Sequence, residues 1–77
     1  MRVFLNPGHH PGIDPGAVNR DYGVTEADIA RDIGNLTAGY LTAAGCEVKT
    51  VQSNNLAGED PDYTNVCLSA NTWPADI

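Results

Sequence analysis

The chain opens with a stretch in which polar and apolar residues alternate, Arg2–Leu5, and the alternation stops at Asn6-Pro7-Gly8. A two-residue period is typical of a β-strand, so we predict a first strand with an abrupt end. The next stretch, Gly8–Gly23, contains four of the eight glycines and both histidines. Such a density of glycine, together with Pro11 and Pro15, predicts an irregular loop, and long irregular loops in compact domains are usually functional.

A helix is predicted after this loop, between Thr25 and Gly45. Thr25 can act as its N-cap, with Asp28 three residues later in an acidic variant of the capping box. Gly45 suits the left-handed position that ends a helix. Apolar residues recur at helical spacing along one side of this segment, and we expect that side to pack against a sheet. This apolar stripe consists of Ile29, Ile33, Leu36, Tyr40 and Leu41.

The second part of the chain predicts a strand over Cys46–Gln52, a helix over Asp62–Thr72 that Pro74 ends, and the start of a third strand at Ala75–Ile77. Alternating strands and helices call for a parallel sheet with right-handed crossovers. We therefore expect an α/β fold, a three-layer sandwich with a mostly parallel sheet. Two helices are few to cover both faces of such a sheet. Residues 1–77 are thus expected to form the first βαβα(β) half of a single domain whose C-terminal half is absent.

Length and charge exclude several classes of protein. A chain of 77 residues has room for one domain, and its ten acidic and four basic residues give a net charge of −6. The basic residues are scattered, which argues against a nucleic-acid surface. No stretch approaches the ~18 apolar residues of a membrane span. The N-terminus lacks the apolar core of a signal peptide, so we expect no membrane span and no encoded export route.

Two cysteines, Cys46 and Cys67, leave two interpretations open. An even number of cysteines in a short secreted protein suggests a disulfide. Their spacing matches no metal-binding motif, and both lie among apolar residues. The favoured interpretation is therefore a pair of small buried thiols.

The candidate chemistry lies in the loop and at the start of the first helix. His9 follows the first strand immediately, at the carboxyl edge of the sheet, where open α/β sheets bind ligands. Glu26, in the first helical turn, is expected at the same edge. An imidazole and a carboxylate can form part of a catalytic zinc site, which takes three protein ligands such as His₂Glu. The alternatives are a loop histidine bonded to the backbone, and a carboxylate stabilised by the helix dipole.

Neighbouring residues are interpreted as structural. His10 is expected not to bind metal, and Asp14, in an Asp-Pro-Gly turn, is expected to accept hydrogen bonds from backbone N–H groups. Tyr40 and Trp73 are interpreted as packing residues. A nucleotide-binding loop is disfavoured, because the sequence has neither Gly-Lys-Ser/Thr nor GxGxxG and the prolines remove backbone donors.

Two segments resemble the opening of the zinc-dependent N-acetylmuramoyl-L-alanine amidases, the family of bacterial autolysins and phage endolysins. They are VFLNPGHHPGIDPGAV, in which Gly-His and Asp-Pro-Gly-Ala follow a strand, and GVTEADIARDIG, in which a Glu begins a helix. His9 matches the family's first zinc ligand and Glu26 its second. The final SANTWPADI resembles the segment that precedes a Ser-Ile-His motif carrying the third ligand. The resemblance places that ligand and the catalytic glutamate outside the 77 residues, and His10 stands where relatives commonly have glycine.

The resemblance implies a hydrolase that cuts the amide between N-acetylmuramic acid and L-alanine in peptidoglycan, acting at the cell wall outside the cell. It implies a Zn²⁺ cofactor, which would activate water and polarise the scissile carbonyl. It also implies that the 77 residues alone are inactive. The alternative is a truncated or proteolysed, non-catalytic fragment that binds the wall or a partner.

The small size of the chain also predicts association. The apolar stripe needs a sheet to cover it, and the last strand would present an open edge. The surface that so short a chain can bury roughly cancels the entropy lost on ordering it. We therefore expect self-association, or a second chain that completes the domain.

Overall fold

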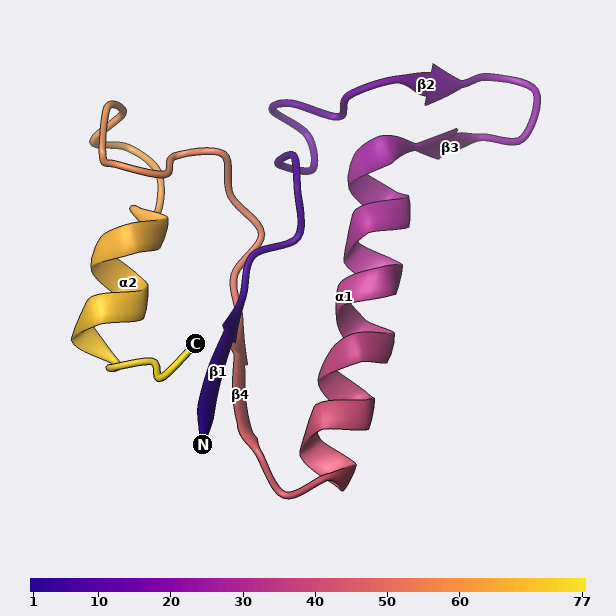
Figure 1. Cartoon of the computed structure of the whole chain (residues 1–77). Helices are drawn as coiled ribbons and strands as arrows, with labels where there is room; N and C mark the ends of the chain where they lie inside the picture. The colour runs from indigo at the N-terminus through magenta and orange to yellow at the C-terminus, as the bar shows by residue number, and fades with distance from the viewer.

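The computed structural model describes all residues 1–77 and contains four short strands and two helices (Figure 1). The elements follow in the order β1 (Arg2–Leu5), β2 (Val18–Asn19), β3 (Val24–Thr25), α1 (Glu26–Ala43), β4 (Glu47–Thr50) and α2 (Val66–Thr72). Neither helix combines the length and the hydrophobicity that crossing a membrane requires.

The central sheet is parallel, as predicted. β1 pairs with β4 in a register that sets Arg2 opposite Glu47 and Leu5 opposite Thr50. The final residues lie along the other edge of β1, where the Phe4 N–H donates to the carbonyl of Ile77 at 2.8 Å. β1 is therefore the central strand, and the backbone of the last residues pairs with it where a third strand was expected to start.

Two helices enclose the sheet in three layers. Figure 1 shows α1 on one side of the β1–β4 pair and α2 on the other. Parallel neighbouring strands need a crossover connection, and α1 provides it between β1 and β4. This arrangement confirms the expected α/β class. The molecule measures 40 × 32 × 12 Å along its principal axes, so a body this thin has almost no interior.

The ends of α1 form as predicted. The Thr25 hydroxyl accepts a hydrogen bond from the Asp28 N–H at 3.2 Å and caps the first turn. Ala44 is the C-cap, and Gly45 follows with φ +93°, the left-handed conformation that favours glycine after a helix.

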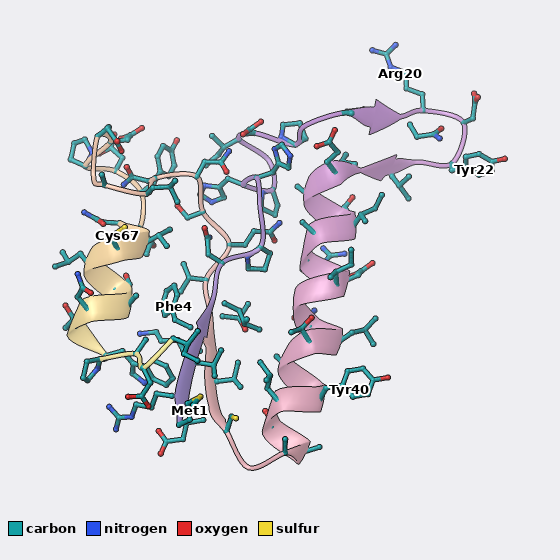
Figure 2. The ribbon with its side chains drawn as sticks, in the orientation of Figure 1. Met1, Phe4, Arg20, Tyr22, Tyr40 and Cys67 are labelled. Atoms are coloured by element: carbon teal, nitrogen blue, oxygen red, sulfur yellow. The ribbon has the colours of Figure 1, made fainter.

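The side of α1 that faces the sheet is not the predicted one. Small residues lie there: Ala27 and Gly34 are buried. Four residues of the apolar stripe are exposed, namely Ile29 (49%), Ile33 (59%), Leu36 (65%) and Tyr40 (79%). Figure 2 shows Tyr40 pointing away from the body of the molecule, so its interpretation as a packing residue is wrong.

The reason is the close approach of α1 to the end of β1. A Cβ atom built on Gly34 would lie 2.5 Å from Cγ of Pro7. Only a residue without a side chain fits between helix and strand at this separation. The larger apolar residues of α1 are therefore excluded from the contact with the chain's own sheet.

Other boundaries also differ from the predictions. β4 is shorter than the predicted strand over 46–52. α2 begins at Val66, not Asp62, because the side chain of Asn65 accepts from the Leu68 N–H at 3.0 Å and caps the helix there. The loop over 8–23 contains β2, which pairs with β3 in an antiparallel hairpin that the sequence analysis missed.

The two cysteines are free, so the structure contains no disulfide. Cys46 is partly exposed and Cys67 is exposed, and Cys67 lies on α2 in Figure 2. The interpretation as two buried thiols is therefore wrong, because Cys46 lies at the exposed end of α1 before β4 and no element covers the side of α2 that carries Cys67.

The core is very small. Only six of the 77 residues are buried, and three of them carry hydrophobic side chains, namely Val3, Ala27 and Val66. These three side chains are the whole buried hydrophobic core of the 77 residues.

Candidate functional site

The site lies at the carboxyl edge of the sheet, where β1 and β4 end beside the first turn of α1. Two amide side chains join these segments. Asn6 donates through Nδ2 to the carbonyl oxygens of Val51 at 2.8 Å and Ser53 at 3.0 Å. Gln52 donates through Nε2 to the carbonyls of Gly8 at 2.9 Å and Ala27 at 2.7 Å. The loop, the end of β4 and the start of α1 are thereby fixed to one another.

His9 and Glu26 meet at this edge. Nε2 of His9 lies 2.7 Å from Oε2 of Glu26. The exposed fraction is 31% for the His9 side chain and 51% for that of Glu26. His9 has φ +66° and is the only residue other than glycine with a positive φ. Such a backbone conformation is uncommon for residues other than glycine, and it concentrates at functional sites. The predicted pair is thus brought together in the structure, in direct contact and open to solvent.

The turn around Asp-Pro-Gly closes over this pair. The Glu26 N–H donates to the carbonyl of Ala17 at 2.9 Å, and the Ala27 N–H donates to that of Pro15 at 3.0 Å. Gly16 has φ +70°, and a Cβ atom built on it would lie 2.8 Å from both Cβ of Glu26 and Cε1 of His9. Glycine at this position therefore satisfies both the backbone conformation and the space above the pair.

Asp14 contacts His9 from the other side of the ring. Its Oδ2 lies 3.4 Å from Nδ1 of His9, and it accepts a hydrogen bond from the side chain of Asn54. The prediction that the Asp14 carboxylate binds backbone N–H groups is therefore wrong, since its partners are side chains. The spacing of a carboxylate five residues after a histidine gave no signal of this contact, which depends on the turn between them.

The two carboxylates control the charge of His9. Desolvation acts to lower the pKa of His9, but the hydrogen bonds to Glu26 and then Asp14, with the charges of both, outweigh it. The pKa of His9 is therefore raised above its ordinary value of 6.5. A proton on the ring satisfies both neighbours, because each ring nitrogen can then donate to a carboxylate.

His10 lies apart from this pair. Its ring meets that of Tyr63 edge to face, with centroids 5.3 Å apart and planes at 81°. Its backbone pairs with that of Asp14 in an isolated bridge. His10 therefore packs on an aromatic ring within the loop, and the expectation that it does not bind metal stays a prediction.

The donor set fits part of a zinc site. No group of three or more His, Cys, Asp or Glu side chains is arranged to hold a metal ion. Two suitable donor atoms nevertheless converge, from His9 and Glu26, and two ligands of a tetrahedral zinc ion lie about 3.3 Å apart. A shallow hollow of about 300 Å³ adjoins them, lined also by Ile29, Ala30 and Ile33. An imidazole nitrogen and a carboxylate oxygen, two kinds of atom that zinc takes as ligands, therefore lie side by side next to a space open to solvent.

Comparison with known proteins supports one family. Residues 3–77 match the family model described as N-acetylmuramoyl-L-alanine amidase. No curated protein and no solved structure matches the chain. The match covers nearly the whole chain, including most of β1, the loop that carries His9, and the start of α1 at Glu26. The chain therefore belongs to the N-acetylmuramoyl-L-alanine amidase family.

Proposed function

We propose that the chain is the N-terminal part of a zinc-dependent amidase domain in which His9 and Glu26 are two of the three zinc ligands. The reaction is hydrolysis of the amide between N-acetylmuramic acid and L-alanine in peptidoglycan, at the cell wall. The observation that carries the proposal is the 2.7 Å contact between Nε2 of His9 and Oε2 of Glu26. It lies at the carboxyl edge of a parallel sheet, where α/β folds bind ligands, in a chain of the amidase family.

In this proposal His9 and Glu26 bind the metal, and the metal supplies the reactive water. Bound zinc would supply an activated water and polarise the scissile carbonyl. His9 would bind through Nε2 and Glu26 through its carboxylate, from a loop and a helix that the hydrogen bonds of Ala17 and Pro15 hold together. Their partial exposure leaves the substrate access to the metal. The family resemblance assigns the third ligand and the catalytic glutamate to residues beyond these 77, so we propose that the 77-residue chain alone is inactive.

Zinc titration by calorimetry tests the two ligands. A site with two protein ligands should bind weakly, and His9→Ala should abolish binding. His10→Ala is the matched control and should bind as the unaltered chain does, because His10 lies against Tyr63. Binding that persists in His9→Ala, or is lost in His10→Ala, would show that the ligand was wrongly chosen. Release of dye from labelled peptidoglycan by the pure 77-residue chain would contradict its inactivity.

A second candidate function, an association module without catalysis, is favoured by the exposed side of α1. Four large apolar side chains on this side have exposed fractions between 49% and 79%, namely those of Ile29, Ile33, Leu36 and Tyr40. A hollow of about 310 Å³ continues this surface between α1 and Leu5, Pro7 and Gly8. Patches of exposed apolar residues mark interaction sites or association. Sedimentation equilibrium and the zinc titration together separate the two candidates, since a pure association module would self-associate without binding zinc.

A further inference from the structure

We infer that Asp14 is a positioning residue that orients the His9 ring, and that Asn54 holds Asp14 in place. The inference rests on the proposed role of His9. The sequence motif around Asp14 is a turn signal, and nothing in it assigns the side chain a role toward the site.

The His9 ring is held from both sides. Nε2 faces Glu26 at 2.7 Å, and Nδ1 faces Asp14 at 3.4 Å. With Asp14 accepting from Nδ1–H, the other nitrogen is the one directed at Glu26. Without that carboxylate, a half-turn of the ring about the Cβ–Cγ bond, which puts a ring carbon in the place of each nitrogen, would cost no hydrogen bond on the Asp14 side.

The backbone fixes where the Asp14 side chain can reach. The His10 N–H donates to the carbonyl of Asp14 at 3.0 Å, and the Asp14 N–H donates to that of His10 at 2.8 Å. This reciprocal pair closes a tight turn directly after His9. The carboxylate of Asp14 is thereby returned to the ring of His9 although five residues separate them in sequence.

Asn54 fixes the carboxylate from a distant segment. It donates through Nδ2 to Oδ2 of Asp14, the same oxygen that faces His9. Its neighbours are the two buried polar residues of the chain, Ser53 (2% exposed) and Asn55 (8%). Ser53 donates to the carbonyl of Thr64 at 3.0 Å, and Asn55 donates to that of Tyr63 at 2.8 Å. The loop after β4 is thus anchored on both sides of Asn54.

This arrangement has a chemical consequence for a histidine that binds metal. A carboxylate that accepts from one ring nitrogen fixes the tautomer, orients the ring and raises the basicity of the other nitrogen. Loss of such a partner typically costs about 10–100-fold in metal affinity. Asp14 would act through His9 only, since it contacts neither Glu26 nor the hollow beside it.

The test is a zinc titration of the 77-residue chain followed by the ring ¹⁵N resonances of His9. The unaltered chain should show metal on Nε2 and a proton on Nδ1. Asp14→Ala should weaken binding about 10–100-fold and give a mixture in which some metal is bound through Nδ1. Asp14→Asn keeps an acceptor oxygen and should fall between the two. Asn54→Ala changes no charge and should weaken binding in the same direction.

Asp21→Asn is the matched control, because this carboxylate lies in the β2–β3 hairpin and forms no ion pair. Backbone amide spectra establish that each variant is folded. Unchanged affinity and an unchanged ring spectrum in Asp14→Ala or in Asn54→Ala would overturn the assignment for that residue. If zinc instead binds equally well to His9→Ala, the proposed ligand itself is wrong, which distinguishes the failure of the proposed function from that of this inference.

Discussion

Gly16 offers the sharpest test of how the loop closes over the site. In Gly16→Ala the new methyl group meets Cβ of Glu26 and the His9 ring at 2.8 Å, below any ordinary contact. The substitution also forces alanine into φ +70°. The left-handed conformation costs about 1–2 kcal/mol for a residue with a Cβ atom. The crowding adds about 1–3 kcal/mol, so the expected loss is about 2–5 kcal/mol of unfolding free energy.

Gly12 provides a matched control for this substitution. It has φ +79°, but a Cβ atom built on it meets nothing within 4 Å. Gly12→Ala should therefore show only the backbone cost, about 1–2 kcal/mol. The difference between the two variants isolates the contact of residue 16 with the pair beneath it. Gly16→Ala should also weaken zinc binding, because the methyl group displaces both proposed ligands, while Gly12→Ala should not.

Urea unfolding followed by circular dichroism measures the two free energies. A chain of this size has only a few kcal/mol of stability, so the titrations belong in a stabilising osmolyte such as TMAO, which strengthens burial in every variant alike. Equal destabilisation of Gly16→Ala and Gly12→Ala would refute the reasoning, since it would mean that the backbone of residue 16 does not lie against His9 and Glu26.

Three further predictions concern the helix, the proton and the exposed surface. Gly34→Ala should destabilise the chain, because its methyl group meets Pro7, whereas Gly39→Ala has open space and should stabilise α1 by about 1 kcal/mol in thermal melts. The pKa of His9 is raised in the folded chain, so its charged pairs contribute stability that is full below pH 6.5 and is lost as pH rises through the raised value. His9→Gln should thus destabilise the metal-free chain at pH 5.5 but little at pH 9 in urea titrations, and zinc affinity should fall as pH falls, because the proton competes for Nε2. Leu36→Lys, at a position 65% exposed, should reduce self-association in sedimentation equilibrium without lowering stability; unchanged association would show that this surface is not used.

Local signals were sufficient for the elements whose ends depend on nearby residues. The N-cap of α1 at Thr25 and its end before Gly45 follow from hydrogen bonds and backbone conformations within one turn. The parallel pairing of β1 with β4 follows from the alternation of strand and helix. The contact of His9 with Glu26 could be predicted because both lie at the same edge of such a sheet.

The features that were missed depend on contacts between distant residues. Helical periodicity identifies an apolar side of α1, but the size of Pro7 at the end of β1 decides that the side with Gly34 faces the sheet. The partners of Asp14 depend on Asn54, forty residues away. α2 starts only at Val66, because the carbonyls of the preceding Tyr63 and Thr64 accept hydrogen bonds from the buried Asn55 and Ser53. Each case depends on tertiary geometry that a linear pattern does not contain.

The hydrogen bonds from Glu26 and Ala27 to the loop have a consequence for how the site can open. First-turn N–H groups of a helix normally have no partner within the helix and exchange with solvent quickly. In this chain the carbonyls of Ala17 and Pro15 occupy the first two, and the Thr25 hydroxyl occupies the third, that of Asp28. Deuterium uptake at amides 26 and 27 therefore reports the lifting of the loop from the helix. The exchange rates of these two amides therefore measure how often the His9–Glu26 pair becomes exposed, and the measurement needs neither a bound metal nor a substrate.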